Sequence, residues 1–273
     1  MTRVRLALKQ LPALRVDLRG VTPAALAGLA PAQIERLTVT HGTQTLPLAE
    51  FFMVTCDGAP EPGGELVFEG DLSRFDRIGW QLAGGRIVVT GPVGDYVGAC
   101  MSSGDVQVQG HAGLLAACEM AGGTLTIAGD VGDHAAGSLP GSMDGMRGGT
   151  LIVRGRAGDR FADRMRRGSA LVFGDVGDFL ASRLVAGTIA IGGRAGAHVG
   201  YGMRRGSVVF AGSTPHVAPT FVPALADAPV AWQLLARDLA RHGGPFAGLA
   251  ARRVVRHLGD LSADGRGELI LAA

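Results

Sequence analysis

Two histidines are the candidate catalytic side chains in this sequence, and both occur in a repeated setting. His134 and His198 each stand eleven residues after a recurring glycine, and the same position in other copies of the pattern holds Tyr96, Leu115 and Phe179. The sequence contains no nucleophile elbow, no HExxH zinc motif and no P-loop that would give a histidine a defined catalytic partner. We interpret the two histidines as members of a ladder of bulky side chains, with a ligand or general-base role as the alternative.

Aspartates repeat at a similar interval, each placed one residue after a glycine. The repeating positions are Asp95, Asp133, Asp159 and Asp178. Aspartate side chains in turns commonly accept hydrogen bonds from nearby backbone N–H groups. We expect that local role here, and a pair of catalytic carboxylates, as in the β-helices that cleave pectin, is the competing interpretation.

Composition argues against several classes of site and partner. Cys56, Cys100 and Cys118 are widely spaced and form no CxxC or Cys/His cluster, so neither a disulfide framework nor a metal site is expected. The net charge of +2 is too small for a dedicated nucleic-acid or membrane-surface protein. Charges interrupt the amino-terminal segment, and no apolar run reaches about twenty residues. We expect a cytoplasmic protein without a bound cofactor.

Arginines concentrate in one part of the chain. Residues 147–205 hold eleven arginines against four aspartates. Within this segment Arg166 is separated from Arg204, and Arg167 from Arg205, by two repeat lengths. Such a surface could hold a polyanion or an acidic partner. A solvated face, or one paired with a neighbouring protein, is the alternative.

These side chains must be positioned by a repeat that is marked by paired glycines. The first glycine of each pair recurs at spacings of 21, 19, 19, 26, 19, 19 and 19 residues, and the second follows six residues later. The first glycines are Gly64, Gly85, Gly104, Gly123, Gly149, Gly168, Gly187 and Gly206. Between each pair lies a short segment of alternating apolar residues, such as TLTIA or SVVFA, which is typical of a strand.

A single short strand cannot bury its inward side chains, so the copies must stack on one another. We predict an all-β-dominated fold, a right-handed parallel β-helix of about eight coils of about nineteen residues. The glycines are expected at corners that require positive φ or close backbone approach. A column of flexible apolar residues three positions before each coil is expected to lie in the interior. Its members are Leu82, Met101, Met120, Met146, Met165, Leu184 and Met203.

Three segments follow from this pattern. Residues 1–62, which include a short helix expected in TPAALAGLA, are predicted to form an α/β cap on the first coil, and residues 63–214 form the β-helix. Residues 215–273 form a tail in which APVAWQLLARDLARHGG and FAGLAARRVVRHLG have helical spacing and GELILAA is typical of a strand. One coil is longer than its neighbours by seven residues, between Gly137 and Gly145. This insertion is either a partner contact or a tolerated surface loop.

Several runs resemble one family of proteins. They are GWQLAGGRIVVTGPVGDYVGACMSSG, GGTLTIAGDVGDHAAG, MRGGTLIVRGRAGDRFADRMRRG and YGMRRGSVVFAG, and the ending HLGDLSADGRGELIL is also similar. The family is the C subunit of formylmethanofuran dehydrogenase, together with the C subunit of the formyltransferase/hydrolase complex of aerobic methylotrophs. The C-terminal domain of glutamate synthase shares the coil.

The resemblance implies a non-catalytic structural subunit of a formyltransferase/hydrolase complex in tetrahydromethanopterin-linked one-carbon metabolism, from formaldehyde to formate. The A, B and D subunits would be its partners, and a methanofuran-type carrier and tetrahydromethanopterin would serve those other proteins. Because the family's carrier has a glutamate-rich tail, Arg166, Arg167, Arg204 and Arg205 are expected to face that tail or an acidic partner. The alternatives are the C subunit of a formylmethanofuran dehydrogenase, a domain related to glutamate synthase, and a free-standing β-helix enzyme acting on acidic sugars.

Overall fold

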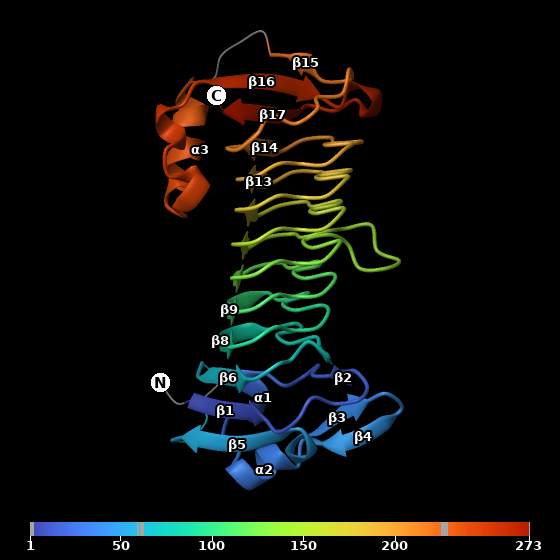
Figure 1. The fold of residues 1–273 in the computed structure, drawn as a ribbon, viewed down its shortest axis with the longest axis vertical. Helices are drawn as coiled ribbons and strands as arrows, with labels where there is room; N and C mark the ends of the chain where they lie inside the picture. The colour runs from blue at the N-terminus through green and yellow to red at the C-terminus, as the bar shows by residue number, and fades with distance from the viewer. Residues whose placement is uncertain (1–2, 59, 61–62, 225–228, 273) are drawn as a thin grey trace.

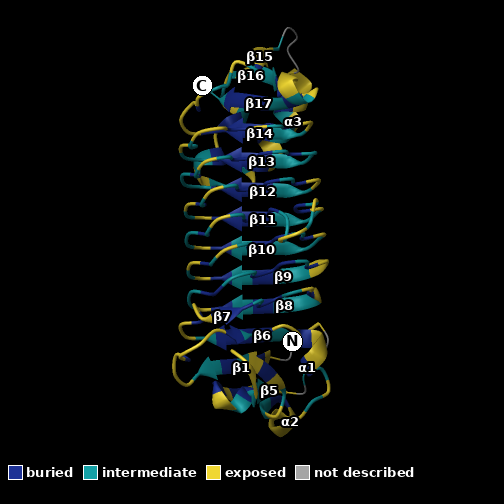
Figure 2. Cartoon of the chain, turned by 90° about the vertical axis from the view of Figure 1, so that its right-hand side faces the viewer, coloured by how far each residue is buried: buried dark blue, intermediate teal, exposed yellow. Residues whose placement is uncertain are grey.

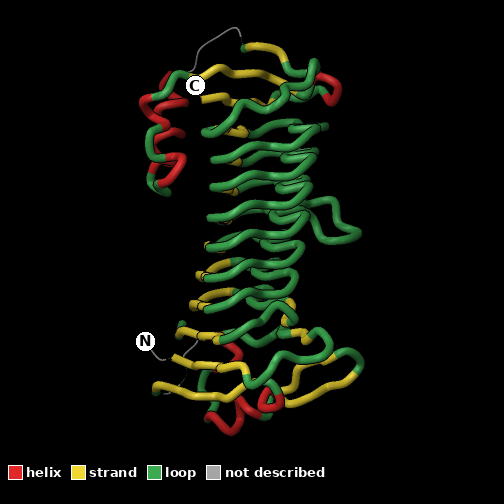
Figure 3. Tube along the Cα trace, viewed as in Figure 1, coloured by secondary structure: helices red, strands yellow, loops and turns green. Residues whose placement is uncertain are grey.

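The molecule is an elongated stack of short strands with a group of additional elements at each end (Figure 1). The computed structural model describes residues 3–58, 60, 63–224 and 229–272. Its strands form a 13-stranded sheet, in the order β15-β16-β17-β14-β13-β12-β11-β10-β9-β8-β6-β1-β5, and a four-stranded sheet, β4-β3-β2-β7. Helices occur near the two ends, and the middle consists of strands and turns (Figure 3). The fold is therefore strand-dominated, with a large and mostly parallel sheet.

The central strands come from successive copies of the glycine repeat. They are β6 (Glu65–Glu69), β8 (Ala83–Val89), β9 (Ser103–Val108), β10 (Thr124–Ile127), β11 (Thr150–Val153), β12 (Ser169–Val172), β13 (Thr188–Ile191) and β14 (Ser207–Phe210). Each pairs in parallel with the corresponding strand of the next copy, so equivalent residues stack in columns. The prediction of strands between the paired glycines is confirmed.

A second parallel column runs along the stack outside these strands. Isolated bridges join Leu72 to Val93, and the chain of bridges continues through Ala112, Val131, Ala157 and Val176 to Ala195. These residues contribute to one apolar core with the inward side of the main sheet. Each copy of the repeat thus encloses apolar side chains that its neighbours above and below complete.

The interior is filled as the spacing predicts. Val89, Ile127 and Val153 are fully buried, and all seven members of the methionine and leucine column are no more than 1% exposed. Figure 2 shows buried residues in the strands along the whole length of the stack. The methionines are therefore packing residues of the core.

The two glycine columns serve different purposes. From Gly85 onward the first column adopts positive φ, from +77° at Gly85 to +116° at Gly187, a conformation that costs other residues free energy. In the second column the backbone of the neighbouring coil lies too close for a side chain. A Cβ atom at Gly91 would lie 2.1 Å from the carbonyl oxygen of Gly70.

The amino-terminal elements extend both sheets beyond the first coil. They are β1 (Arg3–Leu8), β2 (Val16–Asp17), α1 (Pro23–Leu26), α2 (Pro31–Glu35), β3 (Thr38–His41), β4 (Gln44–Pro47), η1 (Leu48–Glu50), β5 (Phe52–Asp57) and β7 (Phe75–Asp76). β1 pairs in parallel with β6 and antiparallel with β5, so it covers the edge of the first central strand. The short helix in TPAALAGLA is confirmed as α1, which begins after its N-cap residue Thr22.

The carboxy-terminal tail is only partly helical. It contains β15 (Val222–Pro223), α3 (Pro229–Ala240), η2 (Gly244–Phe246), η3 (Leu249–Ala251), β16 (Val254–Gly259), η4 (Leu261–Ala263) and β17 (Gly267–Ala272). α3 confirms the first predicted helix, whose predicted first residue lies outside the described residues. The final strand is confirmed as β17, which pairs in parallel with β14 and so extends the main sheet beyond the last coil.

The second predicted helix, FAGLAARRVVRHLG, is wrong. Its first part forms the 3₁₀ turns η2 and η3, and its second part forms β16, which pairs antiparallel with β17. The β-branched pair Val254 and Val255 favours a strand, and the open edge of β17 offers that strand a full set of backbone partners. Tertiary pairing therefore outweighed the helical spacing.

α3 and the turns that follow it pack on the outer face of the last central strands. Trp232, Ala236 and Leu239 of α3 join a second apolar cluster with Leu171 and Val209 of the sheet. That face of the stack is consequently covered over its carboxy-terminal half. Among the described residues, no helix combines the length and apolar character needed to cross a bilayer.

Candidate functional site

The four arginines singled out by the sequence are exposed and stand in two adjacent columns. Because Ser169, Thr188 and Ser207 occupy equivalent positions, the preceding residues also stack, and Val185 lies between Arg166 and Arg204. In the adjacent column, Ala186 lies between Arg167 and Arg205. The two members of each pair are two coils apart, about 10 Å at the usual strand spacing.

The structure groups these arginines differently from the prediction. Arg166 and Arg204 line a groove of about 340 Å³ together with Arg164 and Arg183. The rest of its lining is Met143, Val185, Gly202 and Ala263. Arg167 and Arg205 are exposed but are not among the lining residues. We call this cavity the basic groove.

Arg164 and Arg183 are positioned by a buried carboxylate. Asp163 is 4% exposed and accepts hydrogen bonds from Nε and Nη2 of Arg183, at 3.1 and 2.9 Å, and from the hydroxyl of Ser182. The Nε atom of Arg164 lies 3.7 Å from its other oxygen. A buried carboxylate costs free energy unless it is paired in this way. Asp163 therefore fixes two guanidinium groups at the surface of the stack of coils, which we call the rod.

Sequence reasoning missed Asp163 and its two arginines as a unit. Equivalent positions in other coils hold the buried residues Ala99, Cys118 and Ser182 and, in the last coil, the exposed Tyr201. A charged residue in this column was the available signal, because a buried carboxylate normally has a cationic partner.

The insertion between Gly137 and Gly145 borders the groove. It projects from the side of the stack (Figure 1), and its Met143 is 70% exposed and contacts the guanidinium of Arg164. Asp144 forms an ion pair with Arg166. We call residues 137–145 the insertion loop.

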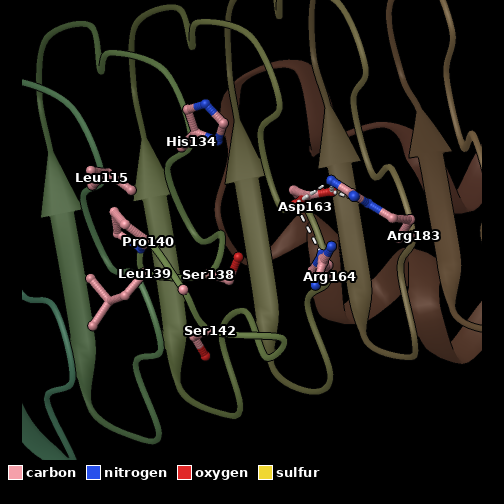
Figure 4. Close-up of a pocket in the computed structure, with 10 residues that line it drawn as sticks. Leu115, His134, Ser138, Leu139, Pro140, Ser142, Asp163, Arg164 and Arg183 are labelled. Atoms are coloured by element: carbon pink, nitrogen blue, oxygen red, sulfur yellow. Dashed lines mark hydrogen bonds and ion pairs between the residues drawn. The ribbon is translucent and has the colours of Figure 1, made fainter.

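A second cavity is lined by residues 138–142 of the insertion loop. Its volume is also about 340 Å³, and it shares Arg164 and Arg183 with the basic groove, while Asp163 lines this cavity only. Figure 4 shows Asp163 held between the two arginines, while His134 and Ser142 lie apart from them. The histidine makes no hydrogen bond to that carboxylate in the structure, so the cavity does not assemble an acid–base pair.

The bulky ladder proposed for the two histidines is confirmed at His198. Phe179 stacks on His198 with ring centroids 4.6 Å apart, and the guanidinium of Arg160 lies 4.8 Å from the Phe179 ring. These residues, like His134, have positive φ. The ladder lies at the margin of the rod, where side chains stack on their equivalents in the next coil.

The repeating aspartates do not act locally, so that prediction is wrong. Each accepts a hydrogen bond from a backbone N–H of the following coil, at 2.7–2.9 Å. The donors for Asp95, Asp133, Asp159 and Asp178 are the N–H groups of Leu114, Asp159, Asp178 and Ala197. Parallel stacking brings the next coil within reach of the side chain, so the carboxylates tie the coils together.

A similar column follows the second glycines. Asp175 accepts a hydrogen bond from the backbone N–H of Arg194 at 2.7 Å and pairs with its guanidinium at 3.2 Å. These interactions lower the pKa of Asp175 below its usual range. Asp175 and Arg194 therefore form an ion pair between successive coils. In the same column, His111 accepts a hydrogen bond from the backbone N–H of Asp130.

The three cysteines lie in surroundings that disfavour the thiolate. Burial raises the pKa of the thiols of Cys56, Cys100 and Cys118, with the largest effect at Cys118. Low thiolate content makes a cysteine a poor nucleophile and a poor metal ligand. Within the described ranges, no group of three or more histidine, cysteine, aspartate or glutamate residues is arranged to hold a metal ion.

Known proteins resemble this chain over its whole length and in shorter segments. A chain in the crystal structure of the formyltransferase/hydrolase complex (FhcABCD) from Methylorubrum extorquens, solved with methylofuran, superimposes with a TM-score of 0.89. The two sequences are 40% identical, and the match covers 98% of this chain and 99% of that one. No family model matches the sequence.

Shorter alignments point to the same proteins. The C subunit of the Fhc complex of Methylorubrum extorquens is 43% identical over 80 residues, which are 29% of each chain. The C subunit of a tungsten-containing formylmethanofuran dehydrogenase from Methanothermobacter wolfeii is 32% identical over 100 residues, 36% of this chain and 37% of that relative. The molybdenum-containing counterpart from Methanosarcina barkeri is 35% identical over 98 residues, 36% of this chain and 33% of its own. The aligned segments thus span about a third of these relatives' length.

Proposed function

The chain belongs to the family formed by the C subunits of formyltransferase/hydrolase complexes and of their formylmethanofuran dehydrogenase relatives, and on that premise we propose that it is a non-catalytic structural subunit of a formyltransferase/hydrolase complex. The observation that carries the proposal is the match to a chain of the FhcABCD complex, which extends over 98% of the sequence at 40% identity. A likeness of that extent includes both ends of the rod as well as the repeat.

The chemistry of the surface supports a scaffolding role. The repeating aspartates join coils, His198 is stacked on Phe179, His111 is hydrogen-bonded to backbone, and the thiols have raised pKa values. An enzyme would need titratable groups converging on a cavity. We propose that the A, B and D subunits carry the chemistry, with a methanofuran-type carrier and tetrahydromethanopterin bound there, in the cytoplasm. The similar complex was solved with methylofuran, a carrier of this type.

The architecture assigned to the scaffold is a right-handed parallel β-helix of about eight coils. Residues 63–214 would form the rod, residues 1–62 an amino-terminal cap and residues 215–273 a carboxy-terminal tail. The stacked parallel strands, the second column of bridges and the shared core support this description. A rod of this kind can offer several long faces to different subunits at once.

We propose that the exposed arginines of the rod bind anions. Arg166, Arg167, Arg204 and Arg205 are exposed and lie close together along one edge. In this proposal they face either the anionic tail of the carrier or an acidic face of a partner subunit.

Membership of a formylmethanofuran dehydrogenase is the second candidate. The relatives in Methanothermobacter wolfeii and Methanosarcina barkeri support it, at 32% and 35% identity. The higher identity to the C subunit of the Fhc complex, 43%, favours the formyltransferase/hydrolase complex.

Affinity purification of the tagged chain from its native cell, followed by mass spectrometry, tests the proposal. We expect the A, B and D subunits of one complex to co-purify in fixed proportion, and we expect the chain purified alone to show no formyl hydrolysis and no cleavage of acidic polysaccharide. Recovery of the chain without these subunits, or turnover by the isolated chain, would contradict a structural role. Co-purification with molybdenum or tungsten subunits would identify the dehydrogenase instead.

A further inference from the structure

The basic groove is built from two columns that cross three coils. Arg164, Arg183 and Gly202 stand in one column, and Arg166, Val185 and Arg204 stand in the other. Met143 of the insertion loop and Ala263 of η4 also line the groove. The cavity is thus elongated along the rod, with guanidinium groups from both columns around an apolar centre.

We propose that the basic groove binds an acidic segment of a partner protein, in which carboxylates flank one apolar side chain, and that Asp144 occupies Arg166 until this segment binds. The proposal deepens the scaffolding function, on which it rests, by naming the surface and the chemistry of its partner.

The charge of the groove calls for an anionic ligand. Four arginines line it, and the carboxylates that pair with them are Asp163 and Asp144. No carboxylate of the described residues forms an ion pair with Arg204. Guanidinium groups bind carboxylates through paired hydrogen bonds, and Asp163 fixes the orientation of Arg183 in this way, while Arg164 lies in an ion pair with the same carboxylate.

The apolar lining favours a protein segment over a purely anionic chain. Met143 is 70% exposed, and Val185 lies between the two arginines of its column. A ligand made only of carboxylates would leave both side chains in contact with water. Methionine and arginine are enriched in protein–protein interfaces, where an apolar anchor is surrounded by charged groups.

Asp144 is placed to compete with the carboxylate of a ligand for Arg166. The insertion loop that carries it occurs in one coil only, and it brings a carboxylate to Arg166 but not to Arg204. Arg166 and Asp144 both retain solvent exposure, 47% and 35% of their side chains, so another carboxylate can reach the pair and replace Asp144.

Fluorescence anisotropy of a labelled pentapeptide with the full chain tests the ligand chemistry. The peptide has two glutamates on each side of a leucine, and its control has glycine at the centre. We expect the leucine peptide to bind more tightly by roughly fivefold, because one side chain of this size gains about 1 kcal/mol or more on burial. Equal binding of the two peptides would overturn the protein-segment proposal and would indicate an anionic tail.

The neighbouring arginine column supplies a matched control. The double variant R166A/R204A should weaken peptide binding about tenfold, through the loss of two charge-assisted hydrogen bonds. R167A/R205A removes the same charge from the same coils outside the groove and should weaken binding less than about twofold. Equal weakening by both double variants would show attraction by bulk charge and would refute the groove.

The variant D144A tests whether Asp144 competes with the peptide for Arg166. Freeing Arg166 should tighten binding of the leucine peptide by about threefold, and this gain should disappear in D144A/R166A. Unchanged or weaker binding by D144A would refute the role of Asp144.

Assembly with co-expressed subunits separates this inference from the proposed function. If the wild-type chain assembles and R166A/R204A dissociates at lower salt than R167A/R205A, both are supported. If the wild type and both variants assemble with equal salt resistance, the groove is not the docking surface although the scaffolding function stands. If the wild type does not assemble, the proposed function fails.

Discussion

Substitution of Gly91 by alanine should force two coils apart. The added Cβ would lie 2.1 Å from the carbonyl oxygen of Gly70, where ordinary contact begins at 3.4 Å. The close contact is with backbone, so no side chain can rotate away, and the coils must separate by roughly 1 Å. The hydrogen bonds from Thr90 N–H to Phe68 and from Leu72 N–H to the carbonyl of residue 92, now 3.0 and 2.9 Å, would then exceed hydrogen-bond length.

The expected loss of stability is about 3 kcal/mol. Two backbone hydrogen bonds contribute roughly 1 kcal/mol each, and strain from overpacking adds a further 1 kcal/mol or more. The matched control is Gly248→Ala, because a Cβ there meets nothing within 4 Å and the backbone needs no positive φ, so its change should stay within about 0.5 kcal/mol.

Guanidinium unfolding followed by circular dichroism would measure both variants. Because stacked repeats can open separately, amide hydrogen exchange in β6 and β8 should also be measured, and protection there should fall in G91A only. If G91A and G248A unfold at the same denaturant concentration, close backbone approach is not the reason for the second glycine column.

Three further predictions concern carboxylates and thiols. Replacing Asp159 by alanine should lower the free energy of unfolding by about 1 kcal/mol, because the N–H of Asp178 loses its acceptor. Asparagine keeps an oxygen at this position, so D159N should lose less than half as much. Equal losses in the two variants would contradict the role of the acceptor. Cys118, whose pKa burial raises, should resist iodoacetamide at pH 8 in the native chain and react in urea, as read by peptide mass spectrometry. Burial would raise the pKa of Asp260, but hydrogen bonds led by that of Ser262 bring it below its usual range. Its ionised form therefore stabilises the fold above the unfolded pKa, and the difference in melting temperature between wild type and D260N should shrink as pH falls below about 4.

The regular spacing of the glycine repeat determines much of the fold directly. Strand pairing, the buried methionine column and the two glycine columns all follow from residues that recur at one interval, because stacking places equivalent residues together. The prediction needed no knowledge of distant contacts, since every contact of this kind joins one copy to the next. That is why the interior could be named residue by residue.

The aspartates show where local reasoning fails in a stacked fold. A turn rule considers the next few residues, whereas the carboxylate of Asp133 serves an N–H group of the following coil, 26 residues away. The signal was present, because aspartates recurred at equivalent positions in successive coils. Repetition of one polar residue type along a solenoid column indicates bonding between coils.

The outer face of the sheet carries a second signal that the strand prediction did not use. In β9 and β10 the outward positions hold Gln107 and Thr126, while in β11 and β12 the same column holds Ile152 and Leu171. An amphipathic strand becomes apolar on both faces where something covers it. The change from one pattern to the other marks the coils on which α3 packs.

The basic groove needed three-dimensional information because its parts come from different coils and from the insertion loop. Arginine spacing predicted the charge, but nothing in the sequence said that Asp144 would reach Arg166 or that Asp163 would hold Arg183. A loop without a repeat counterpart has no column to constrain it, so its contacts cannot be inferred from the period.

The carboxy-terminal coils have two distinct surfaces, the sheet face that α3 covers and the edge that carries the basic groove. On these coils α3 already covers the outward face of the sheet, through Trp232 and Leu239 against Leu171 and Val209. A partner that approaches this face meets α3 and not the sheet, whereas the groove edge combines the guanidinium group of Arg183, fixed by Asp163, with the exposed Met143. The helix covers the apolar outward face of these coils, so in our proposal the partner is selected at the groove edge by its carboxylates together with one apolar side chain.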